Sequence, residues 1–461
     1  MTATPYEILR ARHAETVAAL LPDLIGVVDL PRVQIERVQQ ARLRDLVRHA
    51  RELSPFHARR LDVIDAENFA LEQLPIMTRS DMMAHYDDLL ADRRLTLAEI
   101  NAHLARLEKG GPGAAPGGDA YLLDQYHAVM SSGSSGLRGV FVYDWDAWAI
   151  AYIAYFRMLL RARRREQRFY EEVAAVIGAM NAAHTSTALF QTFSRKVKQV
   201  VFSVTAPLEQ MVAGLNEAQP TILQGYPSAM ALLAREARGG RLHIAPKDIC
   251  VSAEPLLPEI RDALAEVWHA PVWNAWGTSE AGCMAMSCGQ ATGMHLSEDL
   301  VIVEPVDDEY RPVPPGRRAT RVLVTNLFNK GLPLIRYEIS DEVTVLDEAC
   351  PCGSQFLRIA DIQGRREEWF RYGDVAVHPV LFRDPLGLTP NVVEYQVLQT
   401  ARGASIRACI GGSVDFPALA AKIEDSLRAM GVLDPRIEIG EVDALPRGAT
   451  GKIQRFIPLA R

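Results

Sequence analysis

The central part of the chain, residues 173–276, alternates short apolar runs with stretches of helical spacing, and this alternation restricts the fold more than any other feature. The apolar runs lie at residues 173–177, 200–204, 221–223, 249–252 and 271–276. The stretches of helical spacing lie at residues 208–217, 228–237 and 258–269. Strands that alternate with helices form parallel sheets through right-handed crossovers. We therefore predict an α/β fold built on parallel βαβ sheets.

The segments on either side of this region have different patterns. Residues 1–108 have helical spacing. Alternating strands are expected at residues 300–304, 321–326 and 342–346, which indicates an antiparallel subdomain. The last segment has strands of its own at residues 392–398 and 405–410 and a helix at residues 416–430. We predict a large N-terminal domain, residues 1–363, followed by a small α+β C-terminal domain, residues 364–461.

Composition argues against two classes of partner and indicates a compartment. The formal net charge of −7 argues against a nucleic-acid partner held by bulk electrostatics. No apolar run approaches the roughly 20 residues that span a bilayer, so no membrane partner is expected. Six cysteines without a visible secretory signal indicate reduced thiols or metal ligands rather than a disulfide framework. We therefore expect a cytoplasmic protein.

A Ser/Gly-rich segment, residues 131–139, lies between two apolar runs and contains four serines and three glycines. Glycines allow tight turns that expose backbone N–H groups, and serine hydroxyls add donors, which suits a polyphosphate. The segment lacks the Gly-Lys-Ser/Thr of a Walker loop. On composition alone a flexible linker is the alternative. The strand-like residues at both ends favour an ordered phosphate-binding loop.

Two polar loops follow neighbouring predicted strands. The first loop consists of Ser252, Ala253, Glu254 and Pro255, and the second of Trp276, Gly277, Thr278, Ser279 and Glu280. One helix separates the two strands, so both loops emerge at the same edge of the sheet, where α/β folds bind ligands. Gly277 permits close backbone approach, Thr278 supplies a hydroxyl, and Glu280 supplies a hard oxygen for Mg²⁺. Ordinary turn chemistry explains either loop alone, whereas the two together favour a nucleotide site.

Three charged residues lie in short loops further along the chain. Asp341 follows a strand-like run, Arg365 lies on the next polar loop, and Lys452 lies in a Gly/Thr-rich loop near the end. A carboxylate and a guanidinium on neighbouring loops can hold ribose hydroxyls and a phosphate. The alternative for Asp341 and Arg365 is a surface salt bridge, and the alternative for Lys452 is a solvated side chain.

An arginine-rich segment follows a strongly apolar helix predicted at residues 145–160. Residues 161–168 contain five arginines. We expect a solvated helix end, because cations stabilise the C-terminal end of the helix dipole. A phosphate contact is the alternative.

Three cysteines and one histidine match the ligand types of a structural zinc site. They are Cys288, His295, Cys350 and Cys352. A Cys-x-Cys followed by glycine forms a tight knuckle, and Cys₃His is a common structural zinc set. Because many residues separate the two halves, buried free cysteines and a core histidine remain the alternative.

The order of these motifs resembles the AMP-forming acyl-adenylate superfamily, and most closely its branch of phenylacetate–coenzyme A ligases and capsule-type ligases. The matching segments are residues 131–139, 225–228, 252–255, 276–280, 336–341, 364–367 and 451–452. Some positions depart from the usual family pattern. Serines 134 and 135 replace threonines, Leu137-Arg138 replaces Lys-Pro, Trp276 replaces a common tyrosine, and Ser252 replaces a glycine.

The resemblance implies a role for each matching residue. The phosphates of ATP would be held by Ser131, Ser132, Gly133, Ser134, Ser135 and Gly136. Ser252, Ala253, Glu254 and Pro255 would line the adenine slot beside Trp276 and Gly277. Thr278 would contact the α-phosphate, Glu280 the magnesium ion, and Asp341 the ribose hydroxyls, with Arg365 nearby. Glu367 would be the hinge of a mobile C-terminal domain, and Lys452 would bridge the carboxylate and the α-phosphate, where a cation stabilises the developing charge.

The resemblance also implies the reaction. The protein would use ATP and Mg²⁺ to convert a small-molecule carboxylic acid into an acyl-adenylate and pyrophosphate, and would then transfer the acyl group to coenzyme A. Members of this branch have a similar Cys/His pattern, so we expect structural Zn²⁺ at Cys288, His295, Cys350 and Cys352. Two alternatives remain: an acceptor that is an amine, a hydroxylamine or a carrier-protein thiol, and a non-catalytic nucleotide-binding protein. Dimers occur in this branch, so a homodimer is one of the oligomeric states that the resemblance implies.

Overall fold

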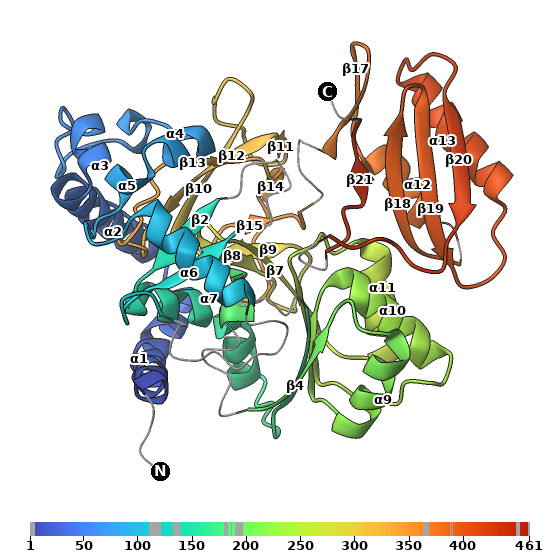
Figure 1. The fold of residues 1–461 in the computed structure, drawn as a ribbon, viewed down its shortest axis with the longest axis horizontal. Coiled ribbons are helices and arrows are strands. Elements are labelled where there is room, and N and C mark those ends of the chain that lie inside the picture. The colour runs from blue at the N-terminus through green and yellow to red at the C-terminus, as the bar shows by residue number, and fades with distance from the viewer. Residues whose placement is uncertain are drawn as a thin grey trace.

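The structure is a computed structural model of the 461-residue chain (Figure 1). It describes residues 5–109, 121–131, 139–178, 183–185, 187–189, 197–362, 368–387, 389, 391–448 and 452–459. Figure 1 shows the N-terminal helices in blue on one side, and the last part of the chain in orange and red on the other.

Helices form the N-terminal part, as the sequence predicts. They are α1 (Pro5–Gly26), α2 (Arg32–Leu53), α3 (Pro55–Arg60), α4 (Arg79–Ala84), α5 (Tyr86–Leu89) and α6 (Leu97–Lys109). Helix α2 buries Leu43, Leu46 and Val47 at helical spacing. Helix α4 begins with a capping box, in which Thr78 and Asp81 each accept a hydrogen bond from the other's backbone N–H. Local sequence therefore determines where these helices start and which face they bury.

A ten-stranded mixed sheet forms the centre of the molecule, in the order β11-β14-β15-β9-β8-β7-β6-β5-β3-β4. Its parallel half contains β3 (Val173–Gly178), β4 (Lys198–Ser203), β5 (Ile222–Gly225), β6 (Asp248–Ser252) and β7 (Val272–Thr278). The connecting helices are α9 (Leu208–Ala218), α10 (Pro227–Arg238) and α11 (Pro258–Trp268). The predicted parallel βαβ sheet is confirmed.

Antiparallel strands continue this sheet beyond β7. They are β8 (Gly282–Met286), β9 (Met294–Leu296), β15 (Arg358–Ile359), β14 (Val343–Leu346) and β11 (Arg318–Ala319). A separate antiparallel sheet contains β10 (Val301–Val306), β12 (Arg321–Asn326) and β13 (Tyr337–Ile339). The strand predicted at residues 342–346 therefore exists, but it belongs to the large sheet rather than to the separate antiparallel one. Its partners β11 and β15 are very short strands, which the sequence pattern did not indicate.

The Ser/Gly-rich segment lies between two strands, as predicted, and the structure shows that these strands form a hairpin. Strand β1 (His127–Met130) pairs antiparallel with β2 (Val140–Tyr143). Helix α7 (Trp145–Arg165) follows directly, and the Asp144 side chain caps it by accepting the N–H of Ala147 at 2.9 Å. Helix α7 packs against α1 and β8.

The prediction of a solvated arginine-rich helix end is wrong for two of the arginines. Arg161 and Arg163 are buried. Arg161 Nε lies 2.7 Å from Asp29 Oδ1, and Arg163 Nε lies 3.0 Å from Asp248 Oδ2. The last turns of α7 lie between the segment that follows α1 and the start of β6, so the exposed Asp29 pairs with Arg161 and the buried Asp248 pairs with Arg163. Both guanidinium groups are paired with carboxylates in this arrangement.

The described residues of the C-terminal part form a four-stranded sheet, a short hairpin and two helices. The sheet has the order β20-β19-β18-β21, with β18 (Val392–Thr400), β19 (Gly403–Ile410), β20 (Arg436–Glu441) and β21 (Phe456–Ile457). The hairpin β16 (Phe370–Tyr372) and β17 (Val375–Val377) and the helices α12 (Val380–Gly387) and α13 (Phe416–Ala429) complete it. The strands and the helix predicted here are confirmed. The predicted domain boundary at 363/364 and the hinge Glu367 lie outside the described residues and stay predictions.

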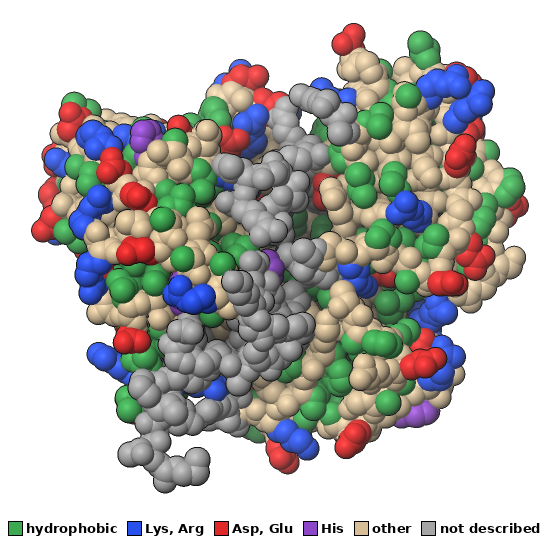
Figure 2. Space-filling view, in the orientation of Figure 1, with side chains coloured by type: hydrophobic (Ala, Val, Ile, Leu, Met, Phe, Trp, Pro, Cys, Tyr) green, Lys and Arg blue, Asp and Glu red, His purple; other side chains and the backbone are tan. Residues whose placement is uncertain are grey.

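The C-terminal part packs on the parallel half of the large sheet. Strand β18 contacts α10, and one apolar cluster joins Leu223 and Met230 with Phe370 and Ile406. On the face shown in Figure 2, acidic and basic side chains are interspersed rather than segregated. Among the described residues, no helix is both long and apolar enough to cross a membrane. The cytoplasmic location stays a prediction.

Candidate functional site

The ends of the Ser/Gly-rich segment are held together at the tip of the β1–β2 hairpin. The Ser131 N–H donates to the Gly139 carbonyl at 2.9 Å, and the Gly139 N–H donates to Ser131 Oγ at 2.9 Å. A Cβ atom at Gly139 would lie 2.8 Å from the buried Phe141 ring, so any larger residue there would force the ring to shift. Ser132, Gly133, Ser134, Ser135 and Gly136 lie outside the described residues. Their predicted phosphate contacts stay predictions.

The two predicted site loops lie at the same edge of the sheet. Ser252, the last residue of β6, pairs with Ala275 of the parallel strand β7. Ala253 has a φ of +73°, a conformation that is costly for a residue with a side chain. This backbone turn leads into Glu254 and Pro255, close to the end of β7. The sequence therefore predicted correctly that the two loops meet.

The end of β7, which contains Gly277 and Thr278, and the turn that follows it are fixed from several sides. A Cβ atom at Gly277 would lie 2.7 Å from the Tyr155 hydroxyl and 2.9 Å from the Gly282 carbonyl oxygen. Thr278 Oγ1 accepts the N–H of Ala281 at 3.2 Å. The Tyr143 hydroxyl donates to the Ser279 carbonyl at 2.6 Å. Gly277 therefore allows the close approach that its position in the sequence indicated.

The Glu280 carboxylate forms an ion pair that the sequence did not reveal. Glu280 is 5% exposed, and its Oε1 lies 3.2 Å from Arg79 Nη2 at the start of α4. Arg79 Nε also donates to the Tyr337 hydroxyl at 3.3 Å. Burial, and next the Glu280 charge, raise the pKa of Tyr143 and of Tyr337, so both phenols stay protonated. A buried carboxylate beside two phenols provides the oxygen ligand that Mg²⁺ prefers.

Two predicted nucleotide-binding residues from distant segments are hydrogen-bonded to each other. The indole N–H of Trp276 donates to Asp341 Oδ2 at 2.8 Å, and both residues are buried. The next residue, Glu342, accepts from Trp369 Nε1 at 2.6 Å and lies 2.8 Å from His378 Nε2. This segment therefore contacts both the end of β7 and the start of the C-terminal part. Arg365 lies outside the described residues, and its role stays a prediction.

The lysine loop lies against the first of the two site loops. The N–H of Ile453, the residue after Lys452, donates to Glu254 Oε1 at 3.0 Å. The second oxygen of Glu254 accepts the Ser228 N–H at 3.1 Å. Arg447 Nη1 donates to Ser228 Oγ at 3.0 Å. The structure therefore brings the Lys452 loop to the edge of the sheet where Trp276 and Thr278 lie.

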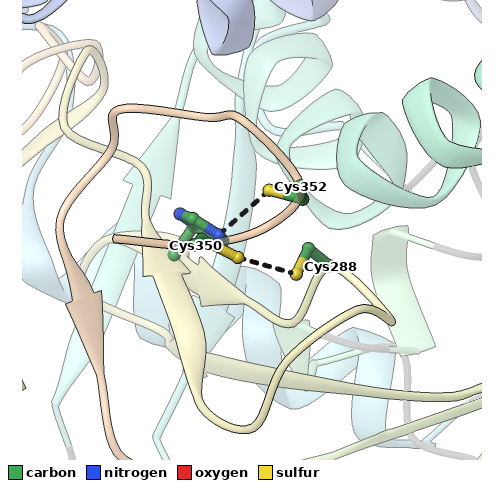
Figure 3. Close-up of side chains that lie close together, drawn as sticks. Cys288, Cys350 and Cys352 are labelled. Atoms are coloured by element: carbon green, nitrogen blue, oxygen red, sulfur yellow. Dashed lines mark hydrogen bonds between the residues drawn. The ribbon is translucent and has the colours of Figure 1, made fainter. Parts of the chain in front are cut away.

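The three cysteines and the histidine of the predicted metal site come together (Figure 3). The ligand atoms of Cys288, His295, Cys350 and Cys352 lie within 4.8 Å of one another, and all four residues are buried. The Sγ atoms of Cys288 and Cys350 are 3.5 Å apart, and Cys352 Sγ lies 3.4 Å from His295 Nε2. Ligands about 2.0–2.3 Å from one tetrahedral zinc ion would be separated by roughly 3.6–3.8 Å. The cluster therefore fits zinc closely in both ligand types and spacing.

The surroundings of the cluster also favour a metal site. His295 Nδ1 lies 3.0 Å from the Phe356 carbonyl oxygen, which can only accept a hydrogen bond. The ring proton is therefore on Nδ1, and the unprotonated Nε2 is able to bind metal. The contact between Cys288 and Cys352 lowers the pKa of the Cys352 thiol and raises the pKa of the Cys288 thiol. A thiolate is the form that binds metal. Arg161 and Arg165 of α7 both donate to the Cys352 carbonyl. The two buried halves of the motif thus meet beside the helix that follows the Ser/Gly-rich segment.

The chain is similar in sequence and in fold to several known proteins. No protein-family model matches the chain. The chain is similar to a phenylacetate-coenzyme A ligase of Thermus thermophilus, with 26% identity over 408 residues, 84% of this chain and 83% of that protein. It is similar to protein CapK of Staphylococcus aureus, with 21% identity over 363 residues, 72% of this chain and 68% of that protein. Its fold matches a crystal structure of 2-hydroxyisobutyryl-CoA ligase in the postadenylation state in complex with R3-HIB-AMP. The TM-score is 0.72 and the sequence identity 18%, and the match covers 93% of this chain and 90% of that chain.

Proposed function

Because the chain belongs to the superfamily of AMP-forming acyl-adenylate enzymes, we propose that it activates a carboxylic acid with ATP. The acid would attack the α-phosphate, and the products would be an acyl-adenylate and pyrophosphate. One observation carries this proposal: the loop of Lys452 is hydrogen-bonded to Glu254, at the edge of the sheet where Trp276 holds Asp341. A nucleotide-binding protein without a reaction has no need for a lysine brought to this edge from a separate sheet.

Each residue at this edge has a role in the proposed step. The Asp341 carboxylate would accept the ribose hydroxyls, and the Thr278 hydroxyl would donate to the α-phosphate. Attack of one anion on another builds up negative charge, which the Lys452 ammonium would stabilise. Glu280 would hold Mg²⁺, which neutralises phosphate charge when it is bound. The backbone N–H groups of residues 131–136 would hold the remaining phosphates.

The acyl group would then pass from the adenylate to the thiol of coenzyme A. The relatives support this acceptor, because the Thermus thermophilus protein and the 2-hydroxyisobutyryl protein are both named as CoA ligases. In this transfer the thiol attacks the acyl carbon, the bond to AMP breaks, and AMP leaves with the electron pair. An amine, a hydroxylamine or a carrier-protein thiol would react at the same carbon and is the alternative outcome.

We also propose that Cys288, His295, Cys350 and Cys352 bind one structural zinc ion. Four protein ligands leave no open coordination position, so the metal would not take part in the reaction. It would join the turn after β8 to the knuckle at residues 350–353, whose Gly353 N–H donates to the Cys350 carbonyl at 3.0 Å. Elemental analysis of purified protein should find about one zinc per chain, and Cys352→Ser should lower this content sharply. Metal-free protein of unchanged thermal stability would refute the assignment.

ATP–pyrophosphate exchange tests the reaction itself. Wild-type protein should exchange label with some member of a panel of aryl, alkyl and amino acids. Lys452→Ala should abolish that exchange, whereas Lys422→Ala, on the exposed side of α13, should not change it. Adding coenzyme A and following product mass identifies the acceptor. If Lys452→Ala exchanged as fast as wild type, the catalytic assignment would be wrong.

A further inference from the structure

The Glu254 carboxylate joins two parts of the chain that are distant in sequence. Its Oε2 accepts the N–H of Ser228, in the first turn of α10, at 3.1 Å. Its Oε1 accepts the N–H of Ile453 in the lysine loop at 3.0 Å. The first turn of a helix has N–H groups without partners in the helix, and its dipole favours an anion. Glu254 is therefore held firmly by α10 and has one oxygen left for the lysine loop.

A second contact ties the same loop to the same turn of α10. Arg447 Nη1 donates to Ser228 Oγ at 3.0 Å, and Arg447 Nη2 lies 3.8 Å from the buried Glu394 Oε1 on β18. The Gly448 N–H donates to the Lys452 carbonyl at 3.0 Å. The loop is thus attached at Arg447 and at Ile453, on either side of the lysine. Both attachments converge on Ser228 and Glu254.

We propose that Glu254 is a positioning residue for Lys452 in the adenylation step, rather than a wall of the adenine slot. Both of its carboxylate oxygens are used by backbone N–H groups, and one of these belongs to the residue next to Lys452. This inference rests on the proposed function. Its effect is confined to the first step, because Lys452 has no further anion attack to stabilise once the acyl-adenylate has formed.

The size of the effect follows from the type of hydrogen bond. Removing a hydrogen bond to a charged group changes an equilibrium or a rate by roughly ten- to a hundredfold. Glu254→Gln keeps the shape but removes the charge and one acceptor oxygen. We expect the kcat of ATP–pyrophosphate exchange to fall by roughly tenfold or more, while the Kd for AMP changes by less than about twofold.

Arg447→Ala tests the same loop from its other attachment. It should lower the kcat of exchange as well, and the double variant with Glu254→Gln should lose less than the product of the two effects, because both residues hold one loop. Arg407→Ala is the matched control: its Nη1 donates to Gln396 within the C-terminal sheet at 3.2 Å. That variant should leave exchange unchanged.

The second step separates this inference from a structural defect. With synthetic acyl-adenylate and coenzyme A supplied directly, Glu254→Gln should form thioester at the wild-type rate. If the AMP Kd of Glu254→Gln rose tenfold with kcat unchanged, Glu254 would line the adenine slot and the inference would be overturned. Equal losses in both steps would also overturn it. Failure of the proposed function looks different, because wild-type protein would then show no exchange with any acid.

Discussion

Trp276→Phe should weaken AMP binding, because it removes one hydrogen bond while keeping an aromatic ring at the end of β7. In the structure the Trp276 indole N–H donates to Asp341 Oδ2 at 2.8 Å, and both side chains are buried. Phenylalanine preserves the apolar wall but cannot donate. Asp341 would then lose the contact that orients its carboxylate toward the proposed ribose position.

The expected magnitude follows from the same contact. A hydrogen bond to a charged group contributes about 1.5–3 kcal/mol, which corresponds to a rise in Kd of roughly 10- to 150-fold if all of it appears in binding. The free protein loses the bond too, so part of the cost appears as lower stability rather than weaker binding. We therefore expect the low end, a rise of about tenfold, measured by titration calorimetry with AMP.

Strand β7 offers a matched control for this measurement. The Trp273 indole N–H donates to the buried Asp248 Oδ1 at 2.8 Å, near the opposite end of the strand. Trp273→Phe makes the same chemical change and should destabilise the fold, but it should leave the AMP Kd unchanged. If both variants weakened AMP binding equally, the effect would be one of stability. If Trp276→Phe bound AMP as tightly as wild type, Asp341 would not depend on the indole.

Three further perturbations have defined outcomes. Asp299→Asn leaves the fully buried Arg157 without the carboxylate that lies 2.7 Å away. The free energy of unfolding, measured with denaturant, should therefore fall by about 3–5 kcal/mol. The double variant with Arg157→Met should lose less stability than the sum of the two single changes. Burial raises the pKa of Glu394 from 4.5 to about 7. Between these pH values the folded protein holds a proton that the unfolded chain has released, so the stability of the fold falls as the pH rises from 4.5 to about 7. A pH series of Tm values should show that Glu394→Gln removes this fall. Gly277→Ala would place a methyl carbon 2.7 Å from a tyrosine hydroxyl and 2.9 Å from a backbone carbonyl oxygen, so pyrophosphate exchange should fall by more than tenfold, whereas Gly440→Ala, where nothing lies within 4 Å of the added carbon, should leave it unchanged.

The parallel half of the large sheet was predictable because its signals are local. Its strands contain short apolar runs, and from β4 to β7 the crossover helices α9, α10 and α11 lie between them, with Pro258 in the first turn of α11. The site loops were predictable for the same reason. Two parallel strands separated by one helix end at the same edge of a sheet whatever their side chains are, so Ser252 and Gly277 had to lie at the same edge.

Features that depend on pairing across the chain were not predictable. The run at residues 342–346 is typical of a strand, but only its short partners β11 and β15 place it in the large sheet. Arg163 reads as a solvated cation at a helix end, and its buried partner Asp248 is 85 residues away. Arg79 lies at the start of α4, and nothing local indicates that it pairs with Glu280. A charge in a sequence does not reveal which opposite charge it will meet.

Strand β7 shows why a site needs position as well as chemistry. Trp273 and Trp276 both donate an indole N–H to a buried aspartate at 2.8 Å. The first bond ties β7 to the start of β6, where Arg163 already neutralises Asp248. The second lies near the carboxyl end of the strand, just before the turn at residues 279–281, where α/β sheets bind ligands. The same type of hydrogen bond therefore stabilises the fold at the start of β7 and forms part of the proposed site at the carboxyl end of β7. The two bonds differ in which end of the strand they occupy.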